Sequence, residues 1–172
     1  MNLCRVGTVE LVSLCFEDGN DEVENPIFLV DLMGCKNPQV KTTLKKLFQC
    51  DTVEKIIHDS RMDCDALFHL HGIVLQNVHD TGCFHAVITG QEDVNVNDTL
   101  QSNGLPTNTI RDKSIYQNNP RFWATRPLTS KMIEWSSSDV DKLLPLATKQ
   151  REKLGSRALE TKKKSMAYTS VV

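Results

Sequence analysis

Aromatic residues are scarce in this chain, and long apolar runs are absent from it. Only 6% of the 172 residues are aromatic, so we expect a core built mainly from Leu, Val and Ile. No apolar run approaches the roughly 18 residues that a membrane-spanning helix needs. Residues 1–5 lack the apolar stretch of a signal peptide. These absences predict an intracellular protein with no membrane partner, in the cytoplasm, with the nucleus as the alternative.

Clustered metal ligands and a strong net charge are also missing. The six cysteines contain no CxxC pair, which favours reduced thiols over disulfides in an intracellular protein. Five histidines accompany Cys64 and Cys83, but none of them has zinc-finger spacing, so we do not expect a zinc site. The net charge of −2 excludes bulk attraction to nucleic acid, and any such contact must come from local patches.

The first elements that the pattern predicts are two strands joined by a turn. Apolar side chains alternate over residues 8–16, and turn residues follow at 17–21. Residues 27–32 form a nearly continuous apolar run, which is typical of a strand buried on both faces. The pair is therefore predicted to form a hairpin.

Helices and strands are expected to alternate after this hairpin. Capping residues, proline at a first helical position and a terminal glycine mark the helix ends. The expected elements are a helix from Asn37-Pro38, a strand at 53–57, a helix from Asp59-Ser60 to Gly72, a strand at 73–78 and a helix from Asp80-Thr81. This order predicts an α/β fold with a mixed sheet flanked by helices.

The C-terminal part of the chain is predicted to be helical, with loops. One short helix is expected over residues 98–104, and Thr129 is expected to cap a helical region that reaches about Lys153 and breaks near residues 136–138. From Gly155 onward the periodicity fades. We therefore predict one domain over residues 1–154 and a basic, disordered tail over residues 155–172.

Three segments together resemble the RNase D/Werner-type DEDD 3′–5′ exonuclease domain. Residues 55–67 contain a strand, a histidine and, five residues later, Asp63, similar to the second motif of the family. Residues 77–81 resemble its strand-ending Asp-Thr, and residues 123–146 resemble its W-x-x-R-P-L and Y-x-x-x-D-V-x-x-L-L-P-L signature. The opening residues 2–7 are similar to exonuclease-domain proteins of the piRNA pathway and of the Egalitarian type.

This resemblance implies a ribonuclease H-like fold and a metal-dependent phosphodiesterase site. In the family, four carboxylates hold two Mg²⁺ or Mn²⁺ ions about 4 Å apart, one on each side of the scissile phosphate. Asp63 matches the carboxylate of the second motif and Asp139 that of the third. Both are therefore expected as metal ligands and catalytic residues.

Two departures from the family pattern weaken the expectation of catalysis. Trp135 stands where the family has a catalytic tyrosine, and an indole offers one N–H donor and no acceptor. The first motif, an Asp-x-Glu on the opening strand, has no counterpart, and Glu10 on the next strand is a poor substitute. Two aspartates alone should bind two divalent ions weakly or one at a time, so we expect an inactive chain.

The same comparison predicts a gap in the sheet. In the family fold, the strand that carries the first motif lies between the strands matched by residues 8–16 and 53–57. Without it, inner strand edges are unpaired, which costs hydrogen bonds and favours association. The expectation is an incomplete chain, begun at an internal methionine or shortened as an isoform. The alternative is a stable pseudo-enzyme that closes its sheet differently, for example through a partner.

A cationic and aromatic strip precedes the third motif. Its cations are candidates for contacts with single-stranded nucleic acid, since such strips bind phosphates and stack on bases: Arg111, Lys113, Arg121 and Arg126. A solvated loop anchored by Trp123 explains the strip equally well. Arg126 is also expected to tie its loop to the sheet.

These expectations predict an exonuclease-like domain that binds single-stranded RNA or DNA, with RNA favoured. If complete, it would hydrolyse phosphodiesters with two Mg²⁺ or Mn²⁺ ions. The alternative function is an inactive RNA-binding adaptor in a small-RNA or mRNA-transport complex with protein partners, and a truncated product without function is the third. The sequence carries no motif that decides between ribose and deoxyribose.

Overall fold

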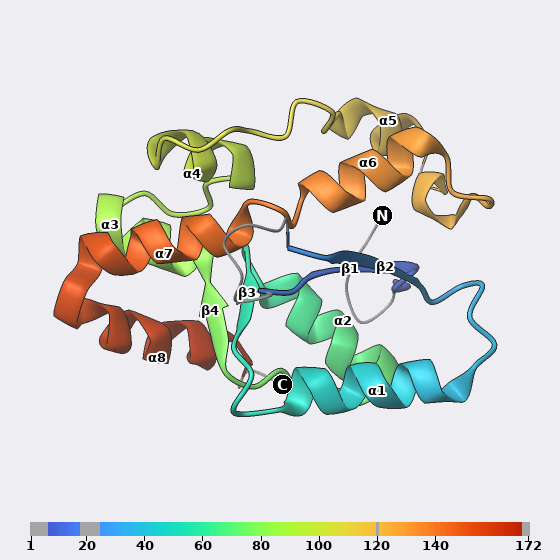
Figure 1. Ribbon diagram of the computed structural model, residues 1–172, viewed down its shortest axis with the longest axis horizontal. Helices are drawn as coiled ribbons and strands as arrows, with labels where there is room; N and C mark the ends of the chain where they lie inside the picture. Colours follow the sequence, from blue (N-terminus) through green and yellow to red (C-terminus); the bar gives the residue numbers. More distant parts are fainter. Residues whose placement is uncertain (1–6, 18–24, 120, 170–172) are drawn as a thin grey trace.

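Two short sheets surrounded by helices make up the computed structural model, which describes residues 7–17, 25–119 and 121–169 (Figure 1). The strands are β1 (Leu11–Cys15), β2 (Ile27–Asp31), β3 (Lys55–Ile57) and β4 (Val78–Asp80). The α-helices are α1 (Pro38–Gln49), α2 (Arg61–His71), α3 (Thr81–Thr89), α4 (Val96–Ser102), α5 (Lys113–Asn118), α6 (Ser130–Ser138), α7 (Leu143–Leu154) and α8 (Ala158–Thr169). Short 3-10 turns occupy Phe122–Ala124 and Gly155–Arg157.

The predicted hairpin is confirmed. β1 pairs with β2 in antiparallel register, with Ser13 opposite Leu29. Alternate side chains of a strand point to opposite faces, and Val12 and Leu14 both pack on the apolar cluster that includes Leu44 and Phe48 of α1. The hairpin is thereby fixed on the helical layer of α1 and α2.

The second sheet holds β3 and β4 in parallel, with Ile56 opposite His79. The strand predicted at 73–78 is present only from Val78, and the strand continues to Asp80. Two contacts explain the difference, because Ile73 N–H donates to Leu67 O and Gln76 N–H donates to Phe48 O. The main chain before β4 therefore bonds to the ends of α2 and α1 and not to a neighbouring strand.

The α/β class is confirmed, but the mixed sheet predicted from the sequence is divided in two. Antiparallel and parallel pairs are both present, yet they belong to separate two-stranded sheets. Within the described residues, no strand lies between β1 and β3. That the family's first strand is lacking stays a prediction, since residues 1–6 lie outside the described part.

Several helix ends follow the capping signals read from the sequence, but the Ser60 side chain makes no cap hydrogen bond at the start of α2. The Asn37 side chain accepts from Gln39 N–H at the start of α1. The Asp80 side chain caps α3, and the Thr129 side chain caps α6. Gly72 ends α2 in the left-handed conformation, with φ of 59°, which glycine adopts without strain. The predicted break in the long C-terminal helical region is also confirmed, since α6 ends at Ser138 and α7 begins at Leu143.

The prediction of a disordered tail is wrong for residues 158–169, which form helix α8 (Figure 1). α8 packs on β4, where Asp80 N–H donates to Ser165 Oγ over 3.2 Å and Val78 N–H donates to Met166 Sδ. Thr161 and Ser165 are 2% and 0% exposed. The buried face of α8 carries small polar residues, because it forms hydrogen bonds with the main chain at a strand edge. Hydrophobic periodicity in the sequence therefore does not reveal this helix.

Two sequence expectations concern thiols and membranes. The cysteines of the described part, at positions 15, 35, 50, 64 and 83, are free, while Cys4 lies outside the described residues. Cys64 and Cys83 are buried and the others are partly exposed. Among the described residues, none of the helices has the length and apolar character needed to cross a bilayer.

The packing of α8 predicts the effect of a buried charge. Ser165→Glu should lower the free energy of unfolding by about 3 kcal/mol or more, because it places an unpaired carboxylate against β4. Lys164→Glu, at an exposed position of the same helix, should change it by no more than about 0.5 kcal/mol. Urea unfolding followed by circular dichroism measures both, and equal stability of the two variants would contradict the docked helix.

Candidate active site

A groove of about 730 Å³ separates the two sheets. β1 and β3 line it along its length, and helices α1, α2, α6 and α7 contribute further residues. Both predicted metal ligands, Asp63 and Asp139, line this groove, together with Trp135 and Arg111. The structure thus brings together residues of α2 and α6 that lie far apart in the sequence.

Asp63 lies in the first turn of α2, at a position fixed by a buried carboxylate. Asp80, which is fully buried, accepts hydrogen bonds from Asp59 N–H over 3.0 Å and from Ser60 N–H over 2.7 Å. The Ser60 hydroxyl donates to the same carboxylate over 2.8 Å. These bonds hold the residues that start α2 against the end of β4, and so they determine where Asp63 enters the groove.

The environment of Asp63 disfavours its charge. Burial raises its pKa from 3.8 to about 7, and the neighbouring carboxylates of Asp59 and Asp80 add to this rise. Near neutral pH the side chain therefore holds a proton for much of the time. Binding of a cation would release that proton, because carboxylate ligands bind metals in the ionised form.

Asp139 follows α6 as its C-cap residue and is held by several donors. Asn108 Nδ2 donates to Asp139 Oδ1 over 2.9 Å, and Arg111 Nη1 lies 3.6 Å from the same oxygen. The Trp135 side chain is a further hydrogen-bond partner. Burial raises the pKa of Asp139, while Arg111 and the hydrogen bonds partly oppose the rise.

Trp135, the residue at the position of the family tyrosine, is part of the aromatic wall of the groove. It is 2% exposed, and its ring lies 5.4 Å from that of Trp123 and 5.9 Å from that of Phe122. Its indole N–H can donate to Asp139 but cannot accept a proton from water. These contacts indicate that Trp135 positions the side chain of Asp139. The catalytic role predicted for Trp135 stays a prediction.

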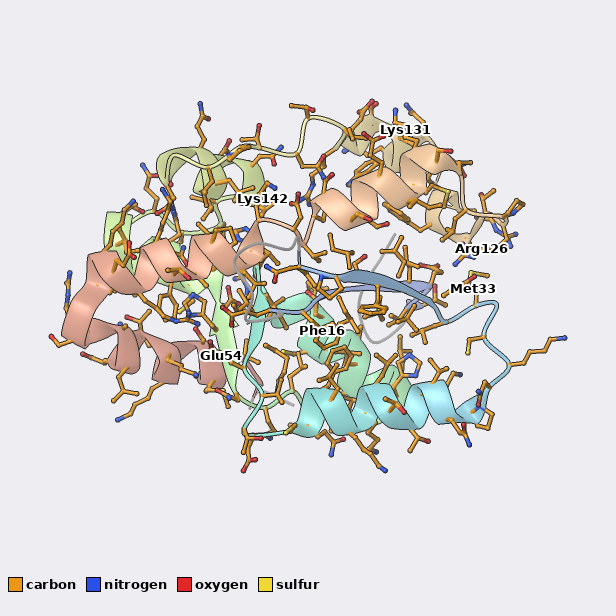
Figure 2. All side chains as sticks on the ribbon, in the orientation of Figure 1. Phe16, Met33, Glu54, Arg126, Lys131 and Lys142 are labelled. Carbon is orange, nitrogen blue, oxygen red and sulfur yellow. The ribbon has the colours of Figure 1, made fainter. Side chains whose placement is uncertain are left out.

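The four predicted nucleic-acid-binding cations lie in different places. Arg111 lines the groove. Arg121 is exposed and does not line it, and the side chain of Lys113 lies outside the described residues. Arg126 lies beside Met33 at the end of the hairpin, away from Glu54 and Lys142 (Figure 2). Of the side chains among these four that the structure describes, only that of Arg111 lines the groove, 3.6 Å from Asp139.

Arg126 has the structural role that the sequence also suggested. Its Nε and Nη2 donate to the two oxygens of Asp31 over 2.6 Å each. Its remaining N–H groups donate to the carbonyls of Trp123, Thr125 and Glu10. A guanidinium has five N–H donors, and all five are engaged here. The geometry therefore supports a tie between loop and sheet, and contact of Arg126 with nucleic acid stays a prediction.

Asn108 is a site residue that sequence reasoning did not single out. It is 5% exposed, its Nδ2 donates to Asp139, and its Oδ1 accepts from Ile110 N–H and Arg111 N–H. One amide thus positions both the carboxylate and the arginine beside it. The one sequence feature that could have pointed to Asn108 is that asparagine often forms a local turn, here in a segment without periodicity.

Similarity to known proteins identifies the family to which the domain belongs. A profile described as 3′-5′ exonuclease matches residues 7–155. The chain belongs to this 3′-5′ exonuclease family. The piRNA biogenesis protein EXD1 of Mus musculus is a distant homologue of this exonuclease domain, 25% identical over 158 residues, which is 84% of this chain. That match covers 26% of EXD1, so the chain spans about a quarter of the length of this relative.

Solved structures share the fold of this exonuclease domain. Trypanosoma brucei RNase D superposes with a TM-score of 0.80 at 20% identity, covering 95% of this chain and 58% of that one. Brucella melitensis NrnC, in a structure with bound Mg²⁺, gives 0.64 at 20% identity over 84% and 69% of the two chains. The RNase D-like fold and the resemblance stated from the sequence are thereby confirmed.

Two described carboxylates of the exonuclease domain could contribute to a cation site in the groove. Asp63 and Asp139 supply carboxylates to the groove, and Mg²⁺ is held in many sites by one or two carboxylates and several waters. Glu10 also lines the groove, and its Oε2 is buried without a hydrogen-bond partner. Even so, within the described part of the chain no three acidic, histidine or cysteine side chains lie close enough together to hold a metal ion.

The raised pKa of Asp63 predicts how the stability of the exonuclease domain depends on pH. The unfolded carboxyl loses its proton near its ordinary pKa of 3.8 and the folded one near 7. The wild type therefore loses stability as pH rises between about 4 and 7. The melting temperature of Asp63→Asn minus that of the wild type should therefore increase between pH 4 and pH 7. Above pH 7 this difference should stay constant.

Calorimetric scans at several pH values measure this difference. Asp51→Asn is the control, because Asp51 is an exposed aspartate outside the groove. Its melting temperature should show no such gain. A constant offset between Asp63→Asn and the wild type from pH 4 to pH 8 would refute the raised pKa.

Proposed function

We propose that this exonuclease-family domain binds single-stranded nucleic acid, RNA in preference to DNA, in the groove between its sheets, and that this polypeptide alone does not cleave it. The observation that carries the proposal is the placement of Asp63, Asp139 and Arg111 along one groove. Arg111 is a cation at its wall, and the partly exposed ring of Trp123 lines the same groove, whereas Trp135 is only 2% exposed and supports Trp123 from behind. Cations and aromatic surfaces together suit single strands.

Lack of cleavage follows from the balance of charge in the groove. Two divalent ions carry four positive charges, and Asp63 and Asp139 offer two negative ones, one of which already faces Arg111. Ions of this kind need more oxygen ligands than two carboxylates supply. Hydrolysis with two Mg²⁺ or Mn²⁺ ions would require further carboxylates beside Asp63 and Asp139.

A second candidate function is that of an RNA-binding adaptor. The name of the mouse relative, piRNA biogenesis protein EXD1, favours a place in a small-RNA complex with protein partners, and an mRNA-transport complex is the alternative. The same groove would then hold RNA for those partners. We place the protein in the cytoplasm as part of this proposal, with the nucleus as the alternative.

Removal of the groove cation tests the binding proposal. Arg111→Gln should weaken binding of a labelled single-stranded RNA several-fold at low salt and reduce the slope of log affinity against log salt by about 1. Fluorescence anisotropy measures both quantities. Lys36→Gln removes one exposed charge outside the groove and is the matched control, and equal effects of the two substitutions would contradict binding in the groove.

A second assay tests the lack of cleavage. Purified protein with 3′-end-accessible RNA and Mn²⁺ should leave the RNA at full length, as resolved on a denaturing gel. The assay includes the variants Asp63→Asn and Asp139→Asn as controls. Cleavage that persists in both variants would come from a contaminating nuclease. Stepwise shortening by the wild type that both substitutions abolish would overturn this part of the proposal.

A further inference from the structure

A second cavity lies between the hairpin and the helices α1 and α2, which are drawn below the hairpin in Figure 1. It measures about 180 Å³. α1 and α2 form one side of it, and β1 and the residue after β2 form the other. Three of its side chains also line the groove of the candidate active site and so separate the two spaces. The apolar walls of the cavity are Val12, Leu32, Leu44, Phe48, Leu67 and Ile73.

Three basic side chains line this cavity, together with Thr42. Lys41 and Lys45 lie one helical turn apart on α1, and His71 is the last residue of α2. Lys45 Nζ lies 3.8 Å from the place that a Cβ atom would take at Gly72, directly after His71. Burial lowers the pKa of His71, and the charge of nearby Lys41 lowers it further. Both ammonium groups therefore lie near the end of α2.

These basic groups have no acidic counterpart nearby in the chain. Residues 32–50, which contain α1, include four lysines and no aspartate or glutamate, and residues 66–79 contain no acidic residue either. In the part of the chain that the structure describes, neither Lys41 nor Lys45 forms an ion pair. His71 Nε2 is buried there without a hydrogen-bond partner, which is costly for a polar atom. Two unbalanced positive charges beside an unpaired buried nitrogen favour an anionic ligand.

We propose that this cavity binds a small aliphatic carboxylate, with its charged end beside Lys41, Lys45 and His71 and its hydrocarbon tail against the apolar walls. One water takes about 30 Å³ in the liquid, so a cavity of about 180 Å³ holds about six non-hydrogen atoms, the size of butanoate. The carboxylate accepts charge-assisted hydrogen bonds from both ammonium groups and one from the N–H of the neutral imidazole. Apolar walls favour a hydrocarbon tail over a fully polar anion such as phosphate. This inference does not depend on nucleic-acid binding or on cleavage.

Sodium butanoate is the probe, titrated into the isotope-labelled full chain and followed by NMR. The imidazole signals of His71 and the methyl signals of Leu44 and Leu67 should shift and saturate, with a Kd on the order of 1 mM. Butanamide has the same shape without the charge and should bind about tenfold more weakly. Acetate keeps the charge but lacks two methylene groups and should also bind about tenfold more weakly. Equal binding of butanoate and butanamide, or shifts that do not saturate, would overturn the proposal.

Two neighbouring lysines of α1 provide a matched pair of variants. Lys45→Gln removes an ammonium group that lines the cavity, whereas Lys46→Gln removes another exposed charge outside it. The first substitution should weaken butanoate binding by about tenfold, the size of one charge-assisted hydrogen bond. The second should weaken it by less than about twofold, because solvent and salt screen a charge outside the cavity. Equal effects of the two substitutions would indicate diffuse attraction to a basic helix and would contradict the site.

Two further measurements complete the test. The circular dichroism spectrum of Lys45→Gln should match that of Lys46→Gln, which shows that weaker binding is not unfolding. A blocked tripeptide that ends in valine with a free carboxylate carries the same chemical groups on a polypeptide, and butanoate should bind at least as tightly as this peptide. Tighter binding of the peptide would assign the cavity to the C-terminus of a polypeptide and would overturn the proposal of a small free acid.

Discussion

The buried carboxylate of Asp80 is the constraint on which the candidate site depends. It accepts hydrogen bonds from the main chain that begins α2 and from Gly82 N–H and Cys83 N–H at the start of α3. One side chain at the end of β4 therefore fixes the start of two helices. Asp63 enters the groove from the first of these helices, so its position follows from this network and not from the packing of α2 alone.

The groove combines two environments that conflict with each other. Much of its lining is apolar, whereas Asp63, Asp139 and Arg111 require water or counterions. The conflict is visible in the titration of the aspartates, since burial raises the pKa of both. Carboxylates that are partly protonated near neutral pH gain most from a cation or from a change in their surroundings. Binding of a cation or another ligand in the groove is therefore expected to change the charge state of Asp63.

Much of the fold could be predicted because local signals agreed with the final structure. Alternation predicted β1, and capping residues such as Asn37 and Thr129 marked helix starts that the structure confirms. The failures occurred where long-range contacts decide the conformation. Ser165 and Thr161 are polar, so no periodicity reveals that α8 covers β4. The strand predicted at 73–78 begins late because its first residues bond to helix ends.

The candidate site was less accessible to sequence patterns than the fold was. Nothing in the spacing of Asp63 and Asp139 predicts that they share a groove, and the expectation came from resemblance to the family. The role of Asn108 could not be foreseen, because a polar residue in an irregular segment gives no sign of the two residues that it will position. Arg126 shows the opposite case, where a cation in a basic strip has all its donors engaged within the fold.

Our central proposal is that the carboxylates of Asp63 and Asp139 alone do not assemble a two-ion centre in this groove. Anomalous diffraction at the manganese edge, from crystals grown with Mn²⁺ and a short RNA, tests it most directly. The account predicts at most one manganese peak beside Asp63 and Asp139, with the RNA uncut. Two well-ordered peaks that bracket a phosphate next to these aspartates would contradict it.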